Sequence, residues 1–373
     1  MKKLCTSGDR LDKLSLDQKP RKEVHDMKYI GIDNHKQYFV ATVVNKQGEL
    51  ISREMVSTDR EPIRDYFSML GNKEELIAVI EASYEWGYLY DQIRDKVREL
   101  KVAHPLKTRL IAEARIKTDK IDADSLANLL RADLIAEAYA PCFETRDKKN
   151  VLRYRSALVK TRTMLKNKAH AVLSRNHIEE EGFRKLTDKF GKKGSEYIRG
   201  FKLRGNDTDI LNHYVDLIEE IDKKIKVVNK EIMESFEIDE VCKLIESVPG
   251  IGKILAVMIR YEIDEIDRFL TKPKLCSYAG LVPSTYSSGG RIYQGRITKQ
   301  GNRWLRWAVT EAAQKAVIRD AWLGMYYDRI AKRRGTKRAR IAVARKLLEI
   351  IYMIWKQGRP YYKKSVAVGL TTV

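Results

Sequence analysis

Cysteine and long hydrophobic runs are both scarce in this chain of 373 residues. The four cysteines are far apart and form no C-x-x-C pair, which argues against a zinc site or a disulfide framework and is typical of a reducing cytosol. No apolar run approaches membrane-spanning length, and IIYMIW at 350–355 is among the longest. Residues 1–26 are charged throughout and lack the apolar stretch of a signal peptide, so we expect a mobile N-terminal extension on a cytoplasmic protein.

Acidic residues are also fewer than basic ones. The chain has 51 Asp and Glu against 72 Lys and Arg, which gives a net charge of +21. The excess is uneven. Residues 329–364 hold 13 basic residues and one acid, and residues 148–175 hold nine basic residues and no acid. Such tracts predict a polyanionic partner, most commonly nucleic acid. The hydrophobic share of 43% indicates a folded protein, and the length allows two or three domains.

The order of predicted elements indicates an α/β domain over residues 27–147. Residues 28–56 are typical of three strands in a meander, and apolar strands follow over 76–82 and up to Pro105. Helical patterns lie between these strands, and a helical tract runs over 106–135. A meander followed by alternating strands and helices predicts a mixed sheet.

The middle of the chain, residues 148–235, has a seven-residue apolar spacing in two stretches. The positions are Val151, Leu158, Leu165 and Val172 in the first stretch, then Leu211, Ile218, Ile225 and Ile232 with Tyr214, Ile221 and Val228 in the second. The spacing predicts a long helical hairpin or coiled-coil arm. Two ordinary amphipathic bundle helices fit the same periodicity. A mainly helical domain over 236–373 follows.

Four acidic residues form a candidate metal site. Asp33 and Glu81 each end an apolar strand, and Asp119 and Asp122 are three apart, hence on one face of a helix. Carboxylate oxygens gathered in this way suit Mg²⁺ or Mn²⁺. Two such ions stabilise the entering and departing oxygens in phosphoryl transfer. Asp124 points elsewhere, and we expect it to be solvated or paired with Lys120.

Each of these acids has a simpler explanation when taken alone. Asp33 fits a turn, and Asp119 fits the N-cap of a helix. The combination favours a metal site, because two strand-end acids and an i, i+3 acid pair occur together in a basic chain.

The stretch STYSSGGRIYQGRITKQGN at 284–302 is a second candidate site. A glycine pair lets the backbone approach a phosphate closely, and a serine beside it can act as a nucleophile when its proton is removed. We take Ser288 as the nucleophile, or Ser287 if the register differs by one. Basic residues that can bind phosphate lie here and in the C-terminal tract: Arg291, Arg296, Lys299, Arg303, Arg333, Arg334, Lys337 and Arg338. On residue chemistry alone a β-hairpin turn explains SSGG better, and both interpretations can hold together.

Two further features have a binding and a structural interpretation. VPGIGKILA at 248–256 is similar to a helix–hairpin–helix turn, whose backbone N–H groups bind phosphate; a plain glycine-rich turn fits as well. Trp304, Trp307, Trp322 and Trp355 are candidates for stacking on bases. Trp304 and Trp307 have apolar neighbours and are better explained as core residues.

The motifs in order resemble one known family. GIDNH, VIEAS, AHPLKTRLIAEARIKTDKIDADSLA, VPGIGKILA and YAGLVPSTYSSGGRIYQGRITKQGNRWLRW resemble the Piv-related insertion-sequence transposases of the IS one-ten family over roughly residues 28–360. The resemblance implies a RuvC-like, ribonuclease-H-type domain with a DEDD tetrad, a coiled-coil arm and a C-terminal transposase domain. The tetrad falls on Asp33, Glu81, Asp119 and Asp122, and the family's serine falls in the SSGG run.

The resemblance also implies an activity and partners. It implies a DNA recombinase that joins DNA transiently to the serine, is guided by a structured bridge RNA that pairs with donor and target DNA, and assembles as dimers and tetramers. The acids and the serine can then form one site only across a domain or subunit boundary. Two rivals remain: a RuvC-like junction-resolving nuclease that uses metal-activated water, and a non-catalytic nucleic-acid-binding protein.

Overall fold

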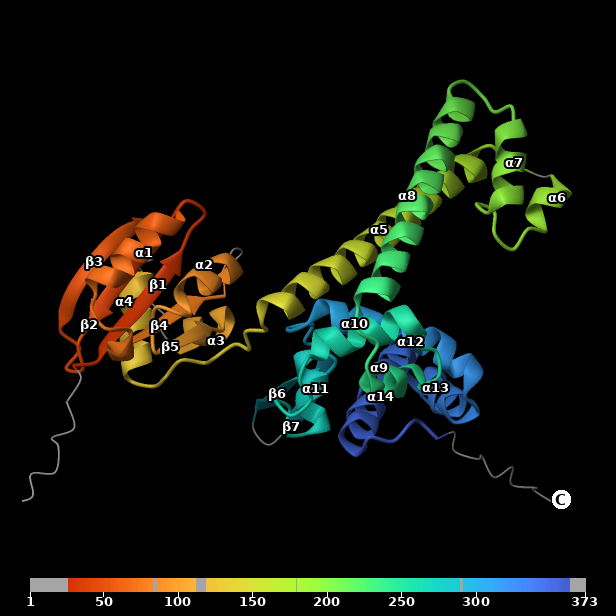
Figure 1. Cartoon of the computed structure of the whole chain (residues 1–373). Coiled ribbons are helices and arrows are strands. Elements are labelled where there is room, and N and C mark those ends of the chain that lie inside the picture. Colours follow the sequence, from red (N-terminus) through yellow and green to blue (C-terminus); the bar gives the residue numbers. More distant parts are fainter. Residues whose placement is uncertain (1–25, 83–85, 112–118, 179, 289–290, 363–373) are drawn as a thin grey trace, which may run out of the picture. The chain divides into compact units, whose positions relative to one another are not determined.

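The computed structural model describes residues 26–82, 86–111, 119–178, 180–288 and 291–362. The chain divides into two compact units, Met1–Ala140 and Pro141–Val373 (Figure 1). The first contains a five-stranded mixed sheet and the second is mainly helical, which bears out the predicted α/β-plus-α class. Residues 1–25 of the predicted N-terminal extension lie outside the described residues. Within the described ranges, no helix has the length and apolar character needed to cross a membrane.

The sheet of the first unit is mixed, as the predicted meander followed by alternation requires. Its strands are β1 (Lys28–Asn34), β2 (Tyr38–Val44), β3 (Leu50–Ser57), β4 (Leu76–Glu81) and β5 (Glu99–Ala103). They lie in the order β3-β2-β1-β4-β5. The three strands of the meander are antiparallel, whereas β4 runs parallel to β1 and β5 runs parallel to β4. The ends of β1 and β4 therefore lie at the same edge of the sheet.

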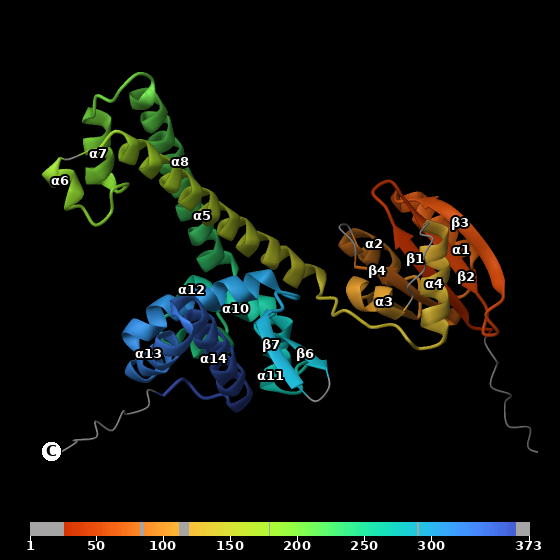
Figure 2. The ribbon, with the colours of Figure 1, turned by 180° about the vertical axis from the view of Figure 1, so that it is seen from behind.

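Helices cover both faces of this sheet. They are α1 (Arg60–Met69), α2 (Trp86–Ile93), α3 (Pro105–Ile111) and α4 (Asp119–Arg131), with a short 3₁₀ turn at Lys73–Glu75. Ile32 and Ile80 pack with Ile63 of α1 in one buried cluster. Val79 packs with Leu126 of α4 in a second cluster on the opposite face. Figure 1 shows α1 in front of the sheet, and Figure 2 shows α4 in front of it from behind.

In the described residues, the helical tract predicted over 106–135 contains α3 and α4. Residues 112–118, which connect them in the sequence, lie outside the described residues. The motif residues Asp119 and Asp122 both belong to the first turn of α4. The start of α4 thus decides where these two acids lie.

Gly31 allows α4 to lie unusually close to β1. A Cβ atom at Gly31 would lie 2.2 Å from the carbonyl oxygen of Ala123 and 2.3 Å from the backbone nitrogen of Ala127. Both separations are far shorter than any normal non-bonded contact. The absence of a side chain at Gly31 is therefore what seats α4 on the sheet.

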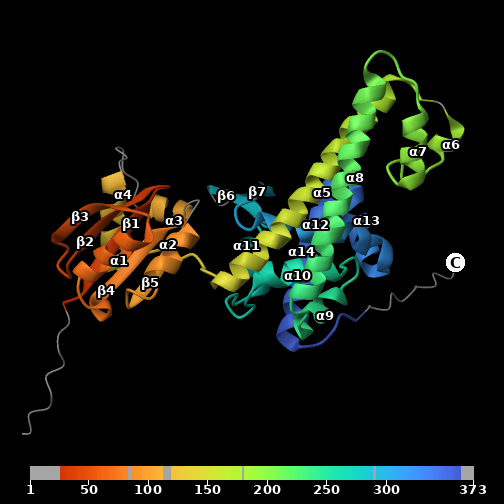
Figure 3. The same cartoon turned by 45° about the horizontal axis from the view of Figure 1, so that its top comes forward.

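The second unit begins with a pair of long helices. These are α5 (Phe143–Arg175) and α8 (Asp207–Ser235), with α6 (Glu181–Arg184) and α7 (Lys192–Gly200) between them in the sequence. The heptad positions Leu165, Val172, Leu211 and Ile218 are buried together with Phe183 and Ile198 of the two short helices. The predicted long helical hairpin is present, with two short helices between its long ones in the sequence (Figure 3).

The remaining helices pack around the other half of this pair. They are α9 (Glu240–Glu246), α10 (Lys253–Ile263), α11 (Lys272–Tyr278), α12 (Arg303–Arg319), α13 (Ala321–Arg334) and α14 (Thr336–Gln357). Leu152 of α5 and Ile232 of α8 lie in the same core as α10, α12 and α14. Between α11 and α12 the strands β6 (Pro283–Ser288) and β7 (Arg291–Ile297) form an antiparallel pair.

Candidate metal centre and nucleic-acid surface

The two strand-end acids, Asp33 and Glu81, occupy adjacent strands at the same level. Ile32 of β1 pairs with Ile80 of β4, so the next position along each parallel strand is Asp33 and Glu81. Side chains alternate between the two faces of a strand. Since Ile32 and Ile80 pack beneath α1 and α2, the two acids belong to the face that α4 covers. The sheet therefore brings both residues to one edge beside the start of α4.

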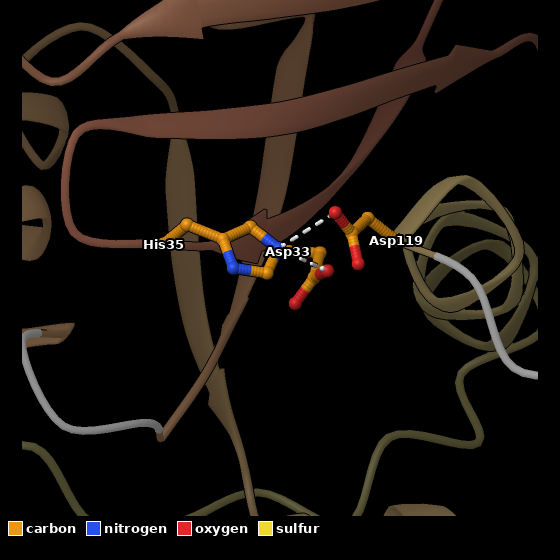
Figure 4. A group of neighbouring side chains, drawn as sticks. All are labelled: Asp33, His35 and Asp119. Carbon is orange, nitrogen blue, oxygen red and sulfur yellow. Dashed lines mark hydrogen bonds and ion pairs between the residues drawn. The ribbon is translucent and has the colours of Figure 1, made fainter.

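The first turn of α4 meets this edge through Asp119. The Oδ2 atom of Asp119 lies 3.2 Å from Nε2 of His35, and the same nitrogen lies 3.1 Å from Oδ2 of Asp33. Tyr38 at the start of β2 donates a 3.2 Å hydrogen bond to Oδ2 of Asp119. Figure 4 shows both contacts as dashed lines that start from the same ring nitrogen of His35. Asp33 and Asp119, which are far apart in the sequence, thus share one partner.

Three potential ligand atoms are close enough to hold a single ion. One atom each from Asp33, His35 and Asp119 lies within 4.8 Å of the other two. The spacing of the acids gives no indication of His35, and its only signal is a ligand-type residue two positions after Asp33. Asp122, the third predicted acid, is close enough to influence Asp33 electrostatically. Glu81, the fourth, is the last residue of the strand adjacent to that of Asp33.

The electrostatics of Asp33 favour a cation at this place. The residue is only 8% exposed, and burial raises the pKa of its carboxyl above the ordinary value. His35 opposes this rise in pKa, whereas the neighbouring carboxylates of Asp122 and Asp119 add to it. Gathered carboxylates in a partly buried place are stabilised in their charged form by a positive ion. The carboxylate oxygens fit a divalent cation of the Mg²⁺ or Mn²⁺ kind.

Asp124 has a different partner from the one predicted. It was expected to be solvated or paired with Lys120, but its carboxylate accepts a 2.7 Å hydrogen bond from Thr42 and a 3.0 Å bond from Nε of Arg53. A second guanidinium nitrogen of Arg53 completes a two-point ion pair. These partners belong to β2 and β3, so Asp124 ties the beginning of α4 to the sheet. The prediction failed because both partners are distant in the sequence.

The predicted serine segment forms a β-hairpin. Ser288 pairs with Arg291 and Ser287 pairs with Ile292 in the β6–β7 ladder, which supports the turn interpretation of SSGG. Gly289, Gly290 and the side chains of both serines and of Arg291 lie outside the described residues. The other predicted phosphate-binding residues of this segment, Arg296, Lys299 and Arg303, are exposed.

The two ambiguous features of the second unit both have structural roles. Gly250 in VPGIGKILA has a φ of +86°, and a Cβ there would lie 2.4 Å from the carbonyl oxygen of Ala312 in α12. The segment is therefore a glycine-rich turn between α9 and α10 that packs tightly on α12. The core interpretation of Trp304 and Trp307 is confirmed, and Trp322 and Trp355 also pack against the same core.

The basic tract of residues 329–364 is exposed around the junction of α13 and α14. Arg333 and Arg334 end α13, Lys337 and Arg338 lie in the first turn of α14, and all four side chains are exposed. Gly335, with a φ of +83°, joins the two helices. Arg329 one turn earlier lies over the ring of Tyr326. This group is a concentrated positive surface suited to a phosphate backbone.

The basic tract of residues 148–175, in α5, is largely bound to other side chains of the second unit. Ion pairs join its residues to acids of other segments: Arg153 to Glu262, Arg162 to Asp222, Lys166 to Asp188 and Arg175 to Asp207. Lys149 is buried, Lys148 bonds to Tyr261 and Arg155 bonds to Asn229. The tract therefore stabilises the helix pair more than it offers charge to nucleic acid. Its partners could not be located from the sequence, because they lie in α8, in α10 and before α7.

Comparisons with known proteins agree with the motifs. A family model described as "Transposase IS116/IS110/IS902 family" matches residues 242–328, and a second, described as "Transposase", matches residues 30–178. The second match contains all four acids of the predicted tetrad, and the first contains the β6–β7 hairpin.

Relatives match along most of the chain. The transposase for insertion sequence element IS1111A of Coxiella burnetii is 24% identical, over 94% of this chain and 96% of its own length. The transposase for IS1328 of Yersinia enterocolitica is 24% identical, over 90% of this chain and 98% of its own. The pilin gene-inverting protein of Moraxella bovis is 27% identical, over 79% of this chain and 84% of its own. Taken together, the two family models and the relatives make this chain similar, along most of its length, to insertion-sequence transposases of the IS116/IS110/IS902 family.

Proposed function

We propose that this protein is a DNA transposase, a divalent-cation-dependent recombinase in which carboxylates and a serine act on DNA phosphates. Asp33, Glu81, Asp119 and Asp122 hold the cation, and Ser288 takes up the phosphate. The observation that carries the proposal is the meeting of three elements at one edge of the sheet: the ends of β1 and β4 and the first turn of α4. The strand order β3-β2-β1-β4-β5 supports a ribonuclease-H-like, RuvC-like domain around these acids.

The cation proposed for this site is Mg²⁺ or Mn²⁺. Such an ion beside a phosphodiester stabilises the charge on the entering and departing oxygens. Residues around the site hold its carboxylates in position before an ion binds. Burial keeps water from the Asp33 carboxylate, Tyr38 orients the carboxylate of Asp119, and Arg53 holds Asp124 so that α4 begins at the right point of the sheet.

The serine step is an exchange of one phosphate ester for another. The hydroxyl oxygen of Ser288 forms a bond to phosphorus as the bond from phosphorus to the departing sugar oxygen breaks. The serine proton is lost and the departing oxygen gains one, so no oxidant or other reactant is required. Arg296, Lys299 and Arg303 are exposed nearby in the sequence and can stabilise the charge on the phosphate.

The nucleic-acid partners of the proposal are donor and target DNA and a structured guide RNA, with self-association as a dimer or tetramer. The exposed group at the α13–α14 junction supplies the backbone contacts. RNA that copurifies with the protein and is removed by ribonuclease but not by deoxyribonuclease would support the guide. Recombination that persists after complete removal of RNA would exclude it.

Replacement of the acids tests the cation site. We expect Asp119→Asn and Asp122→Asn each to reduce DNA strand cleavage by about 100-fold or more, because the ion loses a charged ligand. Asp95→Asn is a matched control, since Asp95 is an exposed aspartate of the same unit that bonds to its neighbour Lys96. Cleavage by the Asn variants at the control rate would support a non-catalytic binding protein instead.

Replacement of the serines separates the recombinase from a junction-resolving nuclease, which the pairing of Ser288 with Arg291 also allows. A protein–DNA adduct that resists denaturation is expected from the wild-type protein and not from Ser288→Ala. Ser287→Ala is the matched control, and loss of the adduct there alone would move the assignment by one residue. Unchanged cleavage by both variants would leave metal-activated water as the nucleophile.

Salt dependence tests the basic surface. Each phosphate contact adds about 0.9 to the slope of log K against log salt on duplex DNA. Alanine at Arg333, Arg334, Lys337 and Arg338 should therefore lower the slope by roughly 3 to 4. A matched control replaces four exposed lysines of α8, some of which already pair with glutamates: Lys223, Lys224, Lys226 and Lys230. Equal slopes in both variants would show that the contacts lie elsewhere.

A further inference from the structure

His35 occupies the turn between β1 and β2, where it lies against both carboxylates of the candidate metal centre. Its backbone N–H donates a 2.9 Å hydrogen bond to the carbonyl oxygen of Tyr38, which closes the turn. Its Nε2 atom lies 3.1 Å from Asp33 Oδ2 and 3.2 Å from Asp119 Oδ2. The turn therefore fixes the imidazole within contact distance of both carboxylates.

The separations of these atoms match those between neighbouring ligands of one ion. In an octahedral site with bonds of about 2.1 Å, adjacent ligand atoms are roughly 3.0 Å apart. The two distances from Nε2 fall close to that value. One ring nitrogen carries at most a single proton, so it cannot give a full hydrogen bond to both carboxylates at once. A cation bound by all three groups satisfies each of them.

The ring is held in this orientation by Tyr38. The two rings are stacked, with centroids 4.8 Å apart and an interplanar angle of 30°. The hydroxyl of Tyr38 donates to the same oxygen of Asp119 that His35 approaches. The side chain of His35 is 35% exposed, which leaves the ring accessible from solvent. The imidazole is thus positioned for ligation before any ion arrives.

We infer that His35 supplies a nitrogen ligand to the cation held by Asp33 and Asp119, so that the site binds Mn²⁺ in preference to Mg²⁺. The inference rests on the proposed function, in which these carboxylates hold a divalent cation. Imidazole suits the transition metals, whereas Mg²⁺ is bound almost entirely by oxygen and water. A site of oxygens alone would not discriminate in this way.

Pulsed electron paramagnetic resonance of Mn²⁺ added to the full-length protein tests the inference directly. We expect the bound Mn²⁺ to show a coupling to a directly bonded nitrogen, which changes when the histidines are labelled with ¹⁵N. His35→Ala should abolish the coupling and lower the preference for Mn²⁺ over Mg²⁺, measured by competition, by at least about tenfold. His213→Ala removes an exposed histidine of α8 and is the matched control.

Three results would overturn the inference, and they distinguish it from the proposed function. The first is that the wild-type protein binds Mn²⁺ without a coupling to a histidine nitrogen, whereas Asp33→Asn does not bind the ion. This result would refute His35 as a ligand while leaving the carboxylate site intact. An unchanged preference for Mn²⁺ in a folded His35→Ala protein would do the same. Failure of the wild-type protein to bind either ion would refute the carboxylate site as well. The isotope measurement uses the wild-type protein, so it decides the matter even if the variant does not fold.

Discussion

Gly31→Ala is the most direct test of how the candidate metal centre is assembled. The new Cβ would lie 2.2 Å from the carbonyl oxygen of Ala123 and 2.3 Å from the backbone nitrogen of Ala127. Both contacts are to backbone atoms of α4, which cannot move aside as a flexible side chain can. Restoring normal contacts requires the helix to move by more than about 1 Å, since non-bonded heavy atoms prefer to be roughly 3.5 Å apart.

The expected cost follows from the behaviour of overpacked cores. Added methyl groups in well-packed sites destabilise by about 1–3 kcal/mol, and contacts to backbone belong at the upper end. A cost of about 3 kcal/mol would raise the population of the opened first unit roughly 150-fold. Because Asp119 and Asp122 begin α4, a shifted helix should also weaken Mn²⁺ binding and DNA cleavage. Misplacement of a catalytic group by about 1 Å is enough to reduce a rate by roughly 100-fold.

Amide hydrogen exchange in the full-length protein measures this effect within the first unit. We expect exchange in β1 and α4 to accelerate by roughly 30- to 150-fold, with little change in α12 and α14. Gly200→Ala is the matched control, because a Cβ there has nothing within 4 Å. Protection of β1 and α4 unchanged within about threefold, together with wild-type Mn²⁺ affinity, would show that α4 does not depend on Gly31 for its position.

Three further predictions concern charged groups. Arg53→Ala removes the two-point partner of Asp124, and since a pair at this exposure is worth at most about 1 kcal/mol, we expect near wild-type stability with cleavage reduced roughly tenfold at saturating DNA; a wild-type rate would contradict a positioning role. Glu262→Gln removes the charge of a fully buried carboxylate that pairs with the partly exposed guanidinium of Arg153, and should cost about 2 kcal/mol in urea unfolding followed by tryptophan fluorescence; an unchanged midpoint would contradict it. Burial lowers the pKa of Lys149 from 10.5 to about 8, so the unfolded chain binds the extra proton between these values and stability should rise with pH by up to about 3 kcal/mol. Lys149→Met should lack this rise between pH 8 and 10.5, and parallel curves for the two proteins would refute the assignment.

The elements near the metal centre could be predicted because their signals are local. The apolar runs before Asp33 and Glu81 define strands, and the i, i+3 spacing of Asp119 and Asp122 defines one face of a helix. The mixed order of the sheet followed from a meander that precedes alternating strands and helices. Those three signals are sufficient to expect the acids at one edge of the sheet.

What the sequence could not provide depends on pairing across the fold. Arg53 has no local feature that marks it as the partner of Asp124, 71 positions away. His35 becomes a candidate ligand only through the turn that brings it back over Asp33 and the helix that brings Asp119 to it.

The same distinction explains why the count of basic residues overstated one nucleic-acid surface. Residues 148–175 have no acid among them, yet Arg153, Arg162 and Arg175 are each neutralised by an acid from another segment. The net charge of a segment predicts the electrostatic field at its surface only if the fold brings no opposite charges from other segments next to it. At the α13–α14 junction, four basic side chains on the two sides of Gly335 remain exposed, so the positive field there persists in the folded protein.

The three aspartates at the start of α4 illustrate how close carboxylates are stabilised in one basic chain. The N-terminus of a helix favours negative charge, which offsets part of their mutual repulsion. Asp124 is further compensated by Arg53, whereas Asp119 is approached by His35 and Tyr38 and faces another acid, Asp33. A permanent guanidinium suits a structural ion pair, because its charge does not vary. An imidazole and a phenol hydroxyl leave the charge of Asp119 largely available, which is what a residue that must bind a cation requires.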